Sequence, residues 1–74
     1  MKKFNVELGK MLKQLRIGSN YSQQEVADTL RVSRSAIANW EQGRRTIYFV
    51  DFIKLCNVYN ADVNDISSSV KKYL

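Results

Sequence analysis

The sequence predicts an all-α fold of five helices within one small domain. Apolar residues recur every three or four positions along most of the 74-residue chain, which is the period of a helix with one buried face. Alternation with a period of two, which a half-buried strand requires, is not sustained anywhere. The chain contains no proline, so its breaks fall at Gly, Asn, Ser and Asp. The five helices are expected at about residues 4–17, 22–30, 33–42, 48–58 and 62–72.

The first expected helix carries an apolar stripe with lysines and glutamine on its opposite side, and it ends near Gly18. The stripe consists of Phe4, Leu8, Met11, Leu12 and Leu15. The second expected helix begins at a capping box, in which the Ser22 hydroxyl accepts from the backbone N–H of Glu25 and the Glu25 side chain accepts from that of Ser22. With about two turns it is too short to be stable alone, so its apolar residues must dock on neighbouring helices.

The third expected helix follows a tight turn at Arg31 and Val32, and Ser33 is its N-cap. Ile37 and Trp40 give this helix an inward edge, which assigns Trp40 to the core and not to stacking on a base. Gly43 stops the helix.

The last two expected helices also carry apolar stripes. Their members are Phe49, Phe52, Ile53 and Cys56 in the fourth, and Val63, Ile66, Val70 and Tyr73 in the fifth. Cys56 has no His or Asp partner on its stripe, so it is interpreted as a small buried hydrophobe.

The chain is basic, with a net charge of +5 and an isoelectric point near 9.6, which favours a polyanionic partner. Ribosomal fragments and membrane-surface peptides share this property, so charge alone does not decide the partner. A single cysteine fits a reducing compartment, and charges interrupt every apolar run well before the roughly 20 residues of a membrane span. The expected protein is soluble and cytoplasmic.

The segment from Gln23 to Gln42 has the pattern of a helix-turn-helix. Two short capped helices are joined by a turn of about three residues, and the small Ala27 allows them to cross closely. The second helix carries small and polar side chains outward. Such a helix is the recognition element in a group of proteins that bind double-stranded DNA.

Across nearly its whole length the chain resembles the Cro- and CI-type repressor family, which includes the xenobiotic-response-element regulators. The matching residues are Leu12, Arg16, Ser22, Gln23, Gln24, Glu25, Val26, Ala27, Val32, Ser33, Ile37, Trp40, Glu41 and Gly43. Two departures stand out. Arg31 occupies a place where the family usually has glycine, and Thr46 stands in a turn where it usually has proline. An arginine with positive φ costs about 1 kcal/mol or more, so we expect the turn at Arg31 to be built differently.

The geometry of a recognition helix assigns base reading to four residues near its start: Arg34, Ser35, Ala38 and Asn39. The guanidinium of Arg34 suits guanine O6 and N7, and the Asn39 amide suits adenine N6 and N7. Ser35 and the methyl groups of Ala38 or Ala36 are weaker readers.

Phosphate contacts are expected on both sides of that helix. Gln23 and Ser33 lie at helix N-termini, where backbone N–H groups and the helix dipole attract anions. The resemblance adds Gln42, Arg44 and Arg45 as a second phosphate clamp. It also implies a buried ion pair between Arg16 and Glu41.

The resemblance further implies a homodimer on a palindromic operator, since one module of this size buries too little surface for selective binding. An apolar stripe near the C-terminus is the candidate interface, although it can equally pack on the core. It comprises Tyr59, Val63, Ile66, Val70, Tyr73 and Leu74.

Catalysis is not expected, because the chain has no histidine, no base beside Cys56 and no glycine-rich phosphate loop or metal-ligand spacing. No metal or cofactor is therefore expected. The predicted function is that of a DNA-binding transcriptional regulator, acting as a repressor. Two alternatives use the same scaffold: the antitoxin of a toxin–antitoxin pair, and a protein-binding adapter that does not read DNA. A regulatory protein partner fits any of the three.

Overall fold

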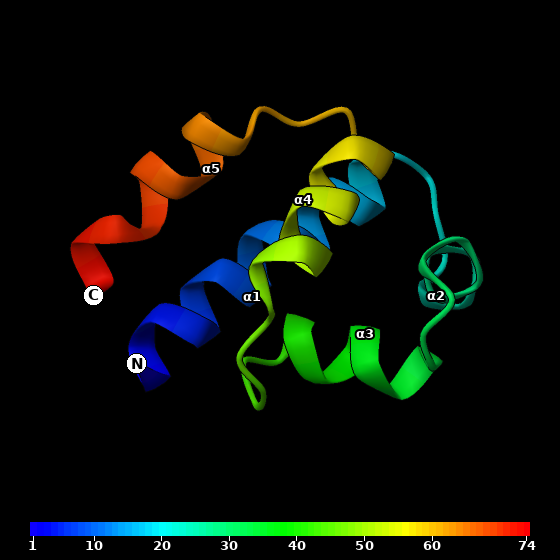
Figure 1. Ribbon diagram of the computed structural model, residues 1–74, viewed down its shortest axis with the longest axis horizontal. Coiled ribbons are helices and arrows are strands. Elements are labelled where there is room, and N and C mark those ends of the chain that lie inside the picture. Colours follow the sequence, from blue (N-terminus) through cyan, green and yellow to red (C-terminus); the bar gives the residue numbers. More distant parts are fainter.

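A computed structural model describes residues 1–74 and contains helices without strands, which confirms the all-α prediction. The five α-helices are α1 (Lys2–Gly18), α2 (Gln23–Leu30), α3 (Arg34–Glu41), α4 (Phe49–Val58) and α5 (Val63–Val70) (Figure 1). A short 3₁₀ turn, η1 (Lys71–Tyr73), follows α5. The expected boundaries agree to within about two residues, which is the usual uncertainty at helix ends. The fifth helix stops at Val70, where the chain tightens into η1.

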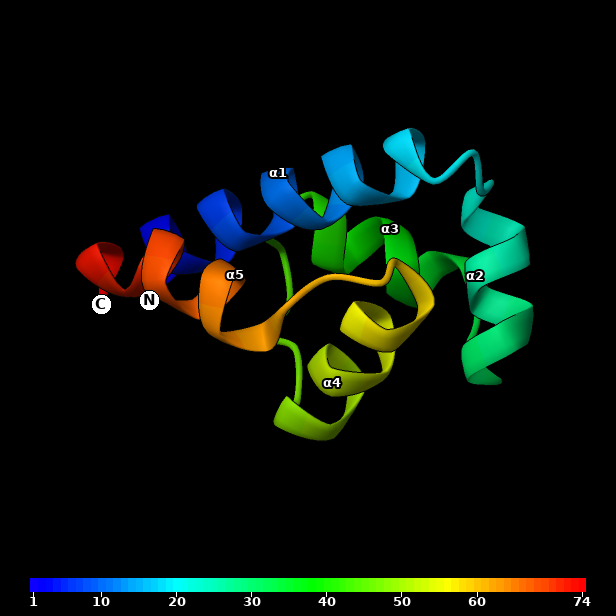
Figure 2. The same ribbon diagram turned by 90° about the horizontal axis from the view of Figure 1, so that it is seen from above.

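The longest helix, α1, runs along one side of the molecule and packs against α3, α5 and η1. Helix α2 contacts α3 and α4 and stands at one end, while both termini lie at the opposite end (Figures 1 and 2). The helix-turn-helix therefore occupies one end and one face of the molecule, and α1 supports it from behind.

All five α-helices contribute to a single core. Its buried side chains are Leu8, Leu12, Val26, Ala27, Leu30, Ala36, Ile37, Trp40, Phe52, Leu55, Cys56, Tyr59, Ile66 and Val70. The short helices α2 and α3 each bury several of these side chains, and this burial supplies the stability that eight isolated residues lack. Cys56 is buried, and that burial raises the pKa of its thiol.

Four helices end with a residue in the left-handed conformation, at Asn20, Arg31, Gly43 and Asn60. Gly and Asn adopt this conformation readily, whereas Arg31, with φ 60° and ψ 44°, does so at a cost of about 1–2 kcal/mol. The backbone N–H of Val32 donates to the carbonyl of Ala27 at 3.0 Å and closes the turn. The expectation of a differently built turn is therefore wrong, because the tight packing of α2 against α3 holds an ordinary left-handed cap with arginine in the place of glycine.

None of the helices combines the length and the apolar character that crossing a membrane requires.

Candidate nucleic-acid interface

Local capping fixes where α2 and α3 begin. The Ser22 hydroxyl accepts from the Glu25 backbone N–H at 3.0 Å, and the Glu25 carboxylate accepts from the Ser22 backbone N–H at 2.8 Å. At the start of α3, the Ser33 hydroxyl oxygen accepts from the backbone N–H of Ala36 at 3.1 Å. Both caps occur at the predicted residues, so hydrogen bonds between near neighbours in the sequence determine where the two helices of the motif begin.

Helix α3 has an inward face and an outward face. Ile37 and Trp40 are buried, and so is Ala36, with only 8% of its surface exposed. Ala36 therefore packs in the core, which removes it as a base-reading candidate. The four predicted base readers lie outside this core, with Arg34 and Ser35 exposed and Ala38 and Asn39 half-buried.

The segment after α3 presents two arginines to solvent and is held by α1. Arg44 and Arg45 are exposed, and Gln42 beside them is exposed as well. The adjacent Thr46 hydroxyl accepts from the Asn5 side-chain amide at 3.1 Å, a link across 41 residues. The sequence did not point to Asn5, because an asparagine near a helix start carries no signal of so distant a partner.

Two glycines let α1 approach α3 and this segment closely. A Cβ on Gly9 would collide with the backbone oxygens of Trp40 and Glu41, the latter at 2.5 Å. Gly43 has φ +73°, and a Cβ there would lie 2.6 Å from the Cα of Val6. Backbone contact at these two points fixes the position of α3 and the arginine pair relative to α1.

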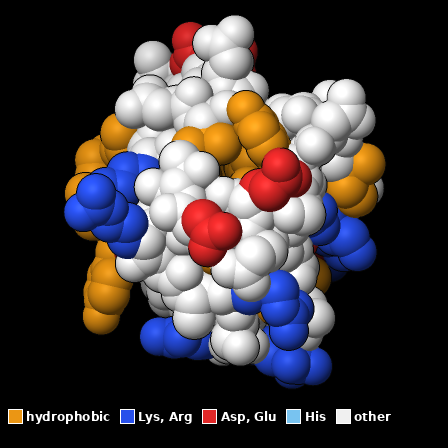
Figure 3. Space-filling view, turned by 90° about the vertical axis from the view of Figure 1, so that its right-hand side faces the viewer, with side chains coloured by type: hydrophobic (Ala, Val, Ile, Leu, Met, Phe, Trp, Pro, Cys, Tyr) orange, Lys and Arg blue, Asp and Glu red, His pale blue; other side chains and the backbone are white.

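Basic side chains lie along the side of the molecule where α3 and the following segment lie, and others lie at mid-height on the left and right edges of the same view (Figure 3). In Figure 3, Lys and Arg side chains lie along the lower edge, which is the side of Figure 1 that contains α3. Acidic side chains lie higher on the same face. The positive charge therefore lies beside the outward face of α3, where it can attract a polyanion.

The expected ion pair between Arg16 and Glu41 is present and connects α1 to the end of α3. Arg16 Nε donates to Glu41 Oε2 at 2.7 Å, and Nη2 donates to Oε1 at 3.1 Å. The side chain of Glu41 is 3% exposed and that of Arg16 is 12% exposed, so the pair is largely removed from water. The hydrogen bond to the Glu41 carboxylate raises the pKa of Arg16 above its ordinary value.

Gln23 joins this pair to the start of the recognition helix. Its Nε2 donates to Glu41 Oε1 at 3.0 Å, and its Oε1 accepts from Arg34 Nη1 at 3.3 Å. The sequence assigned Gln23 to phosphate binding alone. Its contact with Glu41 was missed, because 18 residues separate the two and only the crossing of α2 and α3 brings them together.

The structure corrects half of the predicted dimer interface. Tyr59, Ile66 and Val70 are 7%, 6% and 3% exposed in the single chain and belong to its core. These three residues are not free to contact a second copy, because the core of the single chain already buries them, Tyr59 directly after α4 and Ile66 and Val70 on α5. Burial and the nearby Glu41 carboxylate raise the pKa of Tyr59 to about 12.

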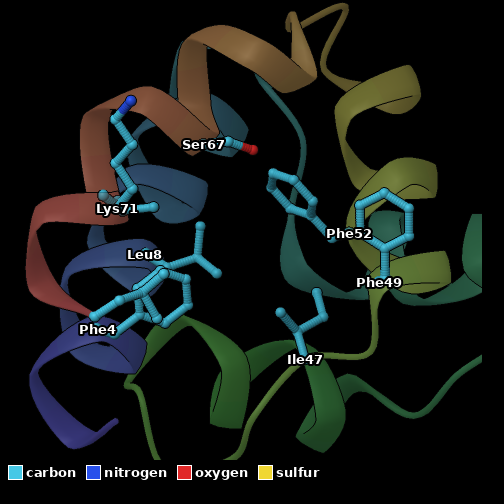
Figure 4. Close-up of a pocket in the computed structure, with 9 residues that line it drawn as sticks. Phe4, Leu8, Ile47, Phe49, Phe52, Ser67 and Lys71 are labelled. Carbon is cyan, nitrogen blue, oxygen red and sulfur yellow. The ribbon is translucent and has the colours of Figure 1, made fainter.

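The other three members of the predicted interface remain at least partly accessible. Val63 and Tyr73 are half-buried and Leu74 is exposed. Leu74 lines an apolar pocket of about 270 Å³ between the start of α1, the start of α4 and α5 (Figure 4). The side chains of Phe4, Phe49 and Phe52 line the same pocket, and Phe49 is 71% exposed.

Comparison with known proteins agrees with this geometry. A family model described as a helix-turn-helix domain matches residues 9–71. The HTH-type transcriptional regulator ImmR of Bacillus subtilis (strain 168) is 32% identical over 59 residues, which cover 80% of this chain and 46% of ImmR. The HTH-type transcriptional activator BcrR of Enterococcus faecalis is 46% identical over 39 residues, which cover 53% of this chain and 19% of BcrR.

The chain thus spans less than half the length of either relative. The family match includes α2, the turn at Arg31, α3 and the two helices after it. It confirms the resemblance to Cro- and CI-type regulators. By sequence and by structure, this chain belongs to the helix-turn-helix domain family.

Proposed function

We propose that the protein is a transcriptional regulator that binds double-stranded DNA in a sequence-specific manner and places α3 in the major groove. The observation that carries this proposal is the outward face of α3, which is short and polar. Its N-terminal end is exposed, and two exposed arginines, Arg44 and Arg45, follow its C-terminal end. The two relatives named as transcriptional regulators support the same function. The protein acts in this proposal by binding and not by catalysis, in the cytoplasm with the DNA.

Base reading is assigned to the first two turns of α3. Arg34 presents a fork of N–H donors that matches guanine O6 and N7, and Asn39 presents a donor and an acceptor that match adenine. Ser35 and the Ala38 methyl make weaker contacts, the latter with a thymine methyl. Each bidentate contact discriminates against the wrong base by about 1–3 kcal/mol.

Phosphate binding is assigned to two places that flank α3. At the first, Gln23 and Ser33 lie at the N-termini of α2 and α3, and the Ser33 hydroxyl retains its proton as a donor because it serves the helix as an acceptor. At the second, Gln42, Arg44 and Arg45 are all exposed. These contacts position the protein on the duplex without selecting a sequence.

Selection from a library of random duplexes tests the main proposal. Enrichment of a defined sequence is expected, and Arg34→Ala should relax the preference at one base pair of that sequence. Arg44→Ala should weaken binding to all duplexes alike and flatten the slope of log affinity against log salt by about one. Lys13→Ala removes the same charge from an exposed position on α1 and should leave the slope nearly unchanged.

The proposal fails if no sequence is enriched at low salt. The distinction between base-reading and phosphate-binding residues fails if Arg34→Ala and Arg44→Ala have the same effect on base preference and on the salt slope.

We further infer that the protein binds as a dimer and represses transcription by occupying a palindromic operator. A single module buries only about 600–1,000 Å² on DNA, so two copies on half-sites about one helical turn apart are needed for tight binding. Val63, Tyr73 and Leu74 remain as interface candidates. Sedimentation with an enriched palindrome should give two chains per duplex, whereas one chain per duplex contradicts the dimer. A promoter–reporter assay distinguishes repression from activation, which is needed because one relative is named an activator.

A further inference from the structure

The apolar pocket of about 270 Å³ lies at the end of the molecule that carries both termini, opposite α2 (Figures 1 and 4). Three phenylalanines, Phe4, Phe49 and Phe52, dominate its lining, and its two polar residues are Ser67 and Lys71. We propose that this pocket is a binding site for a small amphipathic carboxylate. The apolar tail of the ligand lies among the phenylalanines, and its carboxylate meets the two polar residues.

The size of the pocket sets the size of the ligand. An apolar cavity of about 150 Å³ accommodates benzene, so a pocket of about 270 Å³ holds a molecule of about ten non-hydrogen atoms. The pocket opens to solvent on the side of Phe49, whose side chain is 71% exposed. A ligand can therefore enter without unfolding the chain and can keep its polar head at the surface.

Ser67 gives the pocket a hydrogen-bond donor that has no partner within the chain. In Figure 4 its hydroxyl oxygen points from α5 towards Phe52. Serines within helices often donate to the carbonyl of the preceding turn, as Ser69 does to Asp65 at 2.9 Å. The Ser67 hydroxyl makes no such bond, so it is free to donate to a ligand oxygen. A purely apolar occupant would bury this hydroxyl unpaired, at a cost in free energy.

The charge around the pocket favours an anionic head group. Lys71 lies at the edge of the pocket and is exposed (Figure 4). The ammonium groups of Lys3 and Lys72 lie nearby, 5.8 and 5.4 Å from the centre of the Tyr73 ring. None of these three lysines belongs to either ion pair of the chain. An anion at this edge gains attraction from all three, whereas an ammonium group is repelled.

The pocket shares two walls with the segment that carries the proposed phosphate clamp. Phe4 and Ile47 line the pocket, and their sequence neighbours Asn5 and Thr46 share the 3.1 Å hydrogen bond directly after the arginine pair. A molecule that contacts both walls favours this arrangement over any in which the walls separate. This step rests on the proposed function: a bound carboxylate should raise the affinity for all duplexes alike, by about twofold or more.

Titration of the ¹⁵N-labelled protein with sodium octanoate tests the site without DNA. The amide chemical shifts should saturate with a Kd of about 0.2–6 mM, which is the affinity expected of about ten non-hydrogen atoms. The largest changes should occur at residues 4–8, 47–52 and 67–71. Butyrate has the same charge on a shorter chain and should bind about tenfold or more weakly. Octylammonium has the opposite charge on the same chain and should bind about fivefold more weakly.

Two pairs of variants test the polar end of the site. Lys71→Gln and Ser67→Ala should each weaken octanoate binding by about twofold to fivefold. Their matched controls are Lys72→Gln and Ser68→Ala, which change exposed neighbours that do not line the pocket. The controls should leave the Kd nearly unchanged.

A third pair tests the apolar end. Phe49→Ala should weaken octanoate binding by about threefold to tenfold, and the exposure of this side chain allows the variant to fold. Val50→Ala removes a neighbouring side chain that is 58% exposed and does not line the pocket, so it should have little effect.

Three results of these titrations overturn the site. Shifts that rise without saturation, or that are largest elsewhere in the chain, show that octanoate does not bind in the pocket. Equal binding of octanoate and octylammonium, with no effect of Lys71→Gln, shows that the pocket does not select a carboxylate. If dilution of the protein alone moves the same amides and sedimentation detects a dimer, a second copy of the chain occupies the pocket instead.

Duplex binding with and without octanoate tests the coupling separately. If octanoate saturates the pocket and leaves the affinity for an enriched duplex unchanged, the coupling is wrong, while the site and the proposed function both stand. If the protein binds no duplex selectively under either condition, the proposed function fails, and the titrations of the free protein still decide the site.

Discussion

Removing Arg16 should destabilise the fold severely, because its partner cannot leave the core. Glu41 accepts three hydrogen bonds, two from Arg16 and one from Gln23, and its side chain is 3% exposed. In Arg16→Met the carboxylate keeps one of its three donors and stays buried. An unpaired buried charge of this kind costs about 3–5 kcal/mol.

The expected loss is large for a chain of this size. At about 0.05–0.15 kcal/mol per residue, the whole fold is stabilised by about 4–11 kcal/mol. Urea denaturation followed by circular dichroism should show the loss directly, and the Tm should fall by about 12 °C or more. The exposed pair of Lys10 and Glu7, at 3.2 Å, is the internal control, and Lys10→Met should cost less than about 1 kcal/mol.

A double-mutant cycle isolates the pair itself. Arg16→Met combined with Glu41→Leu removes both charges and should be close to wild type in stability, since apolar replacement of a buried pair is often neutral. The coupling energy should then exceed about 2 kcal/mol. A coupling below about 0.5 kcal/mol refutes the reasoning, because the two charges would then contribute independently.

Single positions elsewhere in the fold allow three more tests. Arg31→Gly should raise the free energy of unfolding by about 1 kcal/mol, since it replaces an arginine in the left-handed conformation. A decrease in this free energy, measured by urea denaturation, contradicts the prediction. Gly9→Ala should cost about 1–3 kcal/mol or more through collision with the backbone of Glu41, whereas Gly18→Ala, with open space around it, should be neutral or stabilising; equal effects contradict the close approach. The raised pKa of Tyr59, about 12, predicts stability that is complete below pH 10 and is lost between pH 10 and 12, by about 2–3 kcal/mol; Tyr59→Phe should lack this loss, and parallel pH profiles would contradict it.

The features that depended on local chemistry were predicted from the sequence. Ser22 and Ser33 cap the two helices of the motif at the predicted residues, because a cap involves neighbours within three positions. The helical period located all five helices for the same reason. The ion pair of Arg16 and Glu41 came from the family resemblance, since nothing in the local sequence joins residues 25 apart.

Where a feature depends on tertiary contacts, its prediction from the sequence was missing or wrong. Arg31 takes a conformation that its own preference disfavours, because packing of the flanking helices outweighs a penalty of about 1–2 kcal/mol. Tyr59, Ile66 and Val70 form an apolar stripe that looks the same in sequence whether it faces a core or a partner. Their burial in one chain depends on how the end of α4 and the whole of α5 are placed in the fold, and the periodicity of the sequence alone does not predict that placement.

The most direct test of the account is to locate the DNA on the protein. Amide chemical shifts of ¹⁵N-labelled protein should be followed during titration with a duplex enriched from the random library. The account predicts that the largest changes occur at the start of α3, at residues 33–36, and in the arginine segment at residues 43–45. Largest changes on α5 or around the apolar pocket, with α3 unaffected, would contradict the claim that the polar face of α3 contacts the bases.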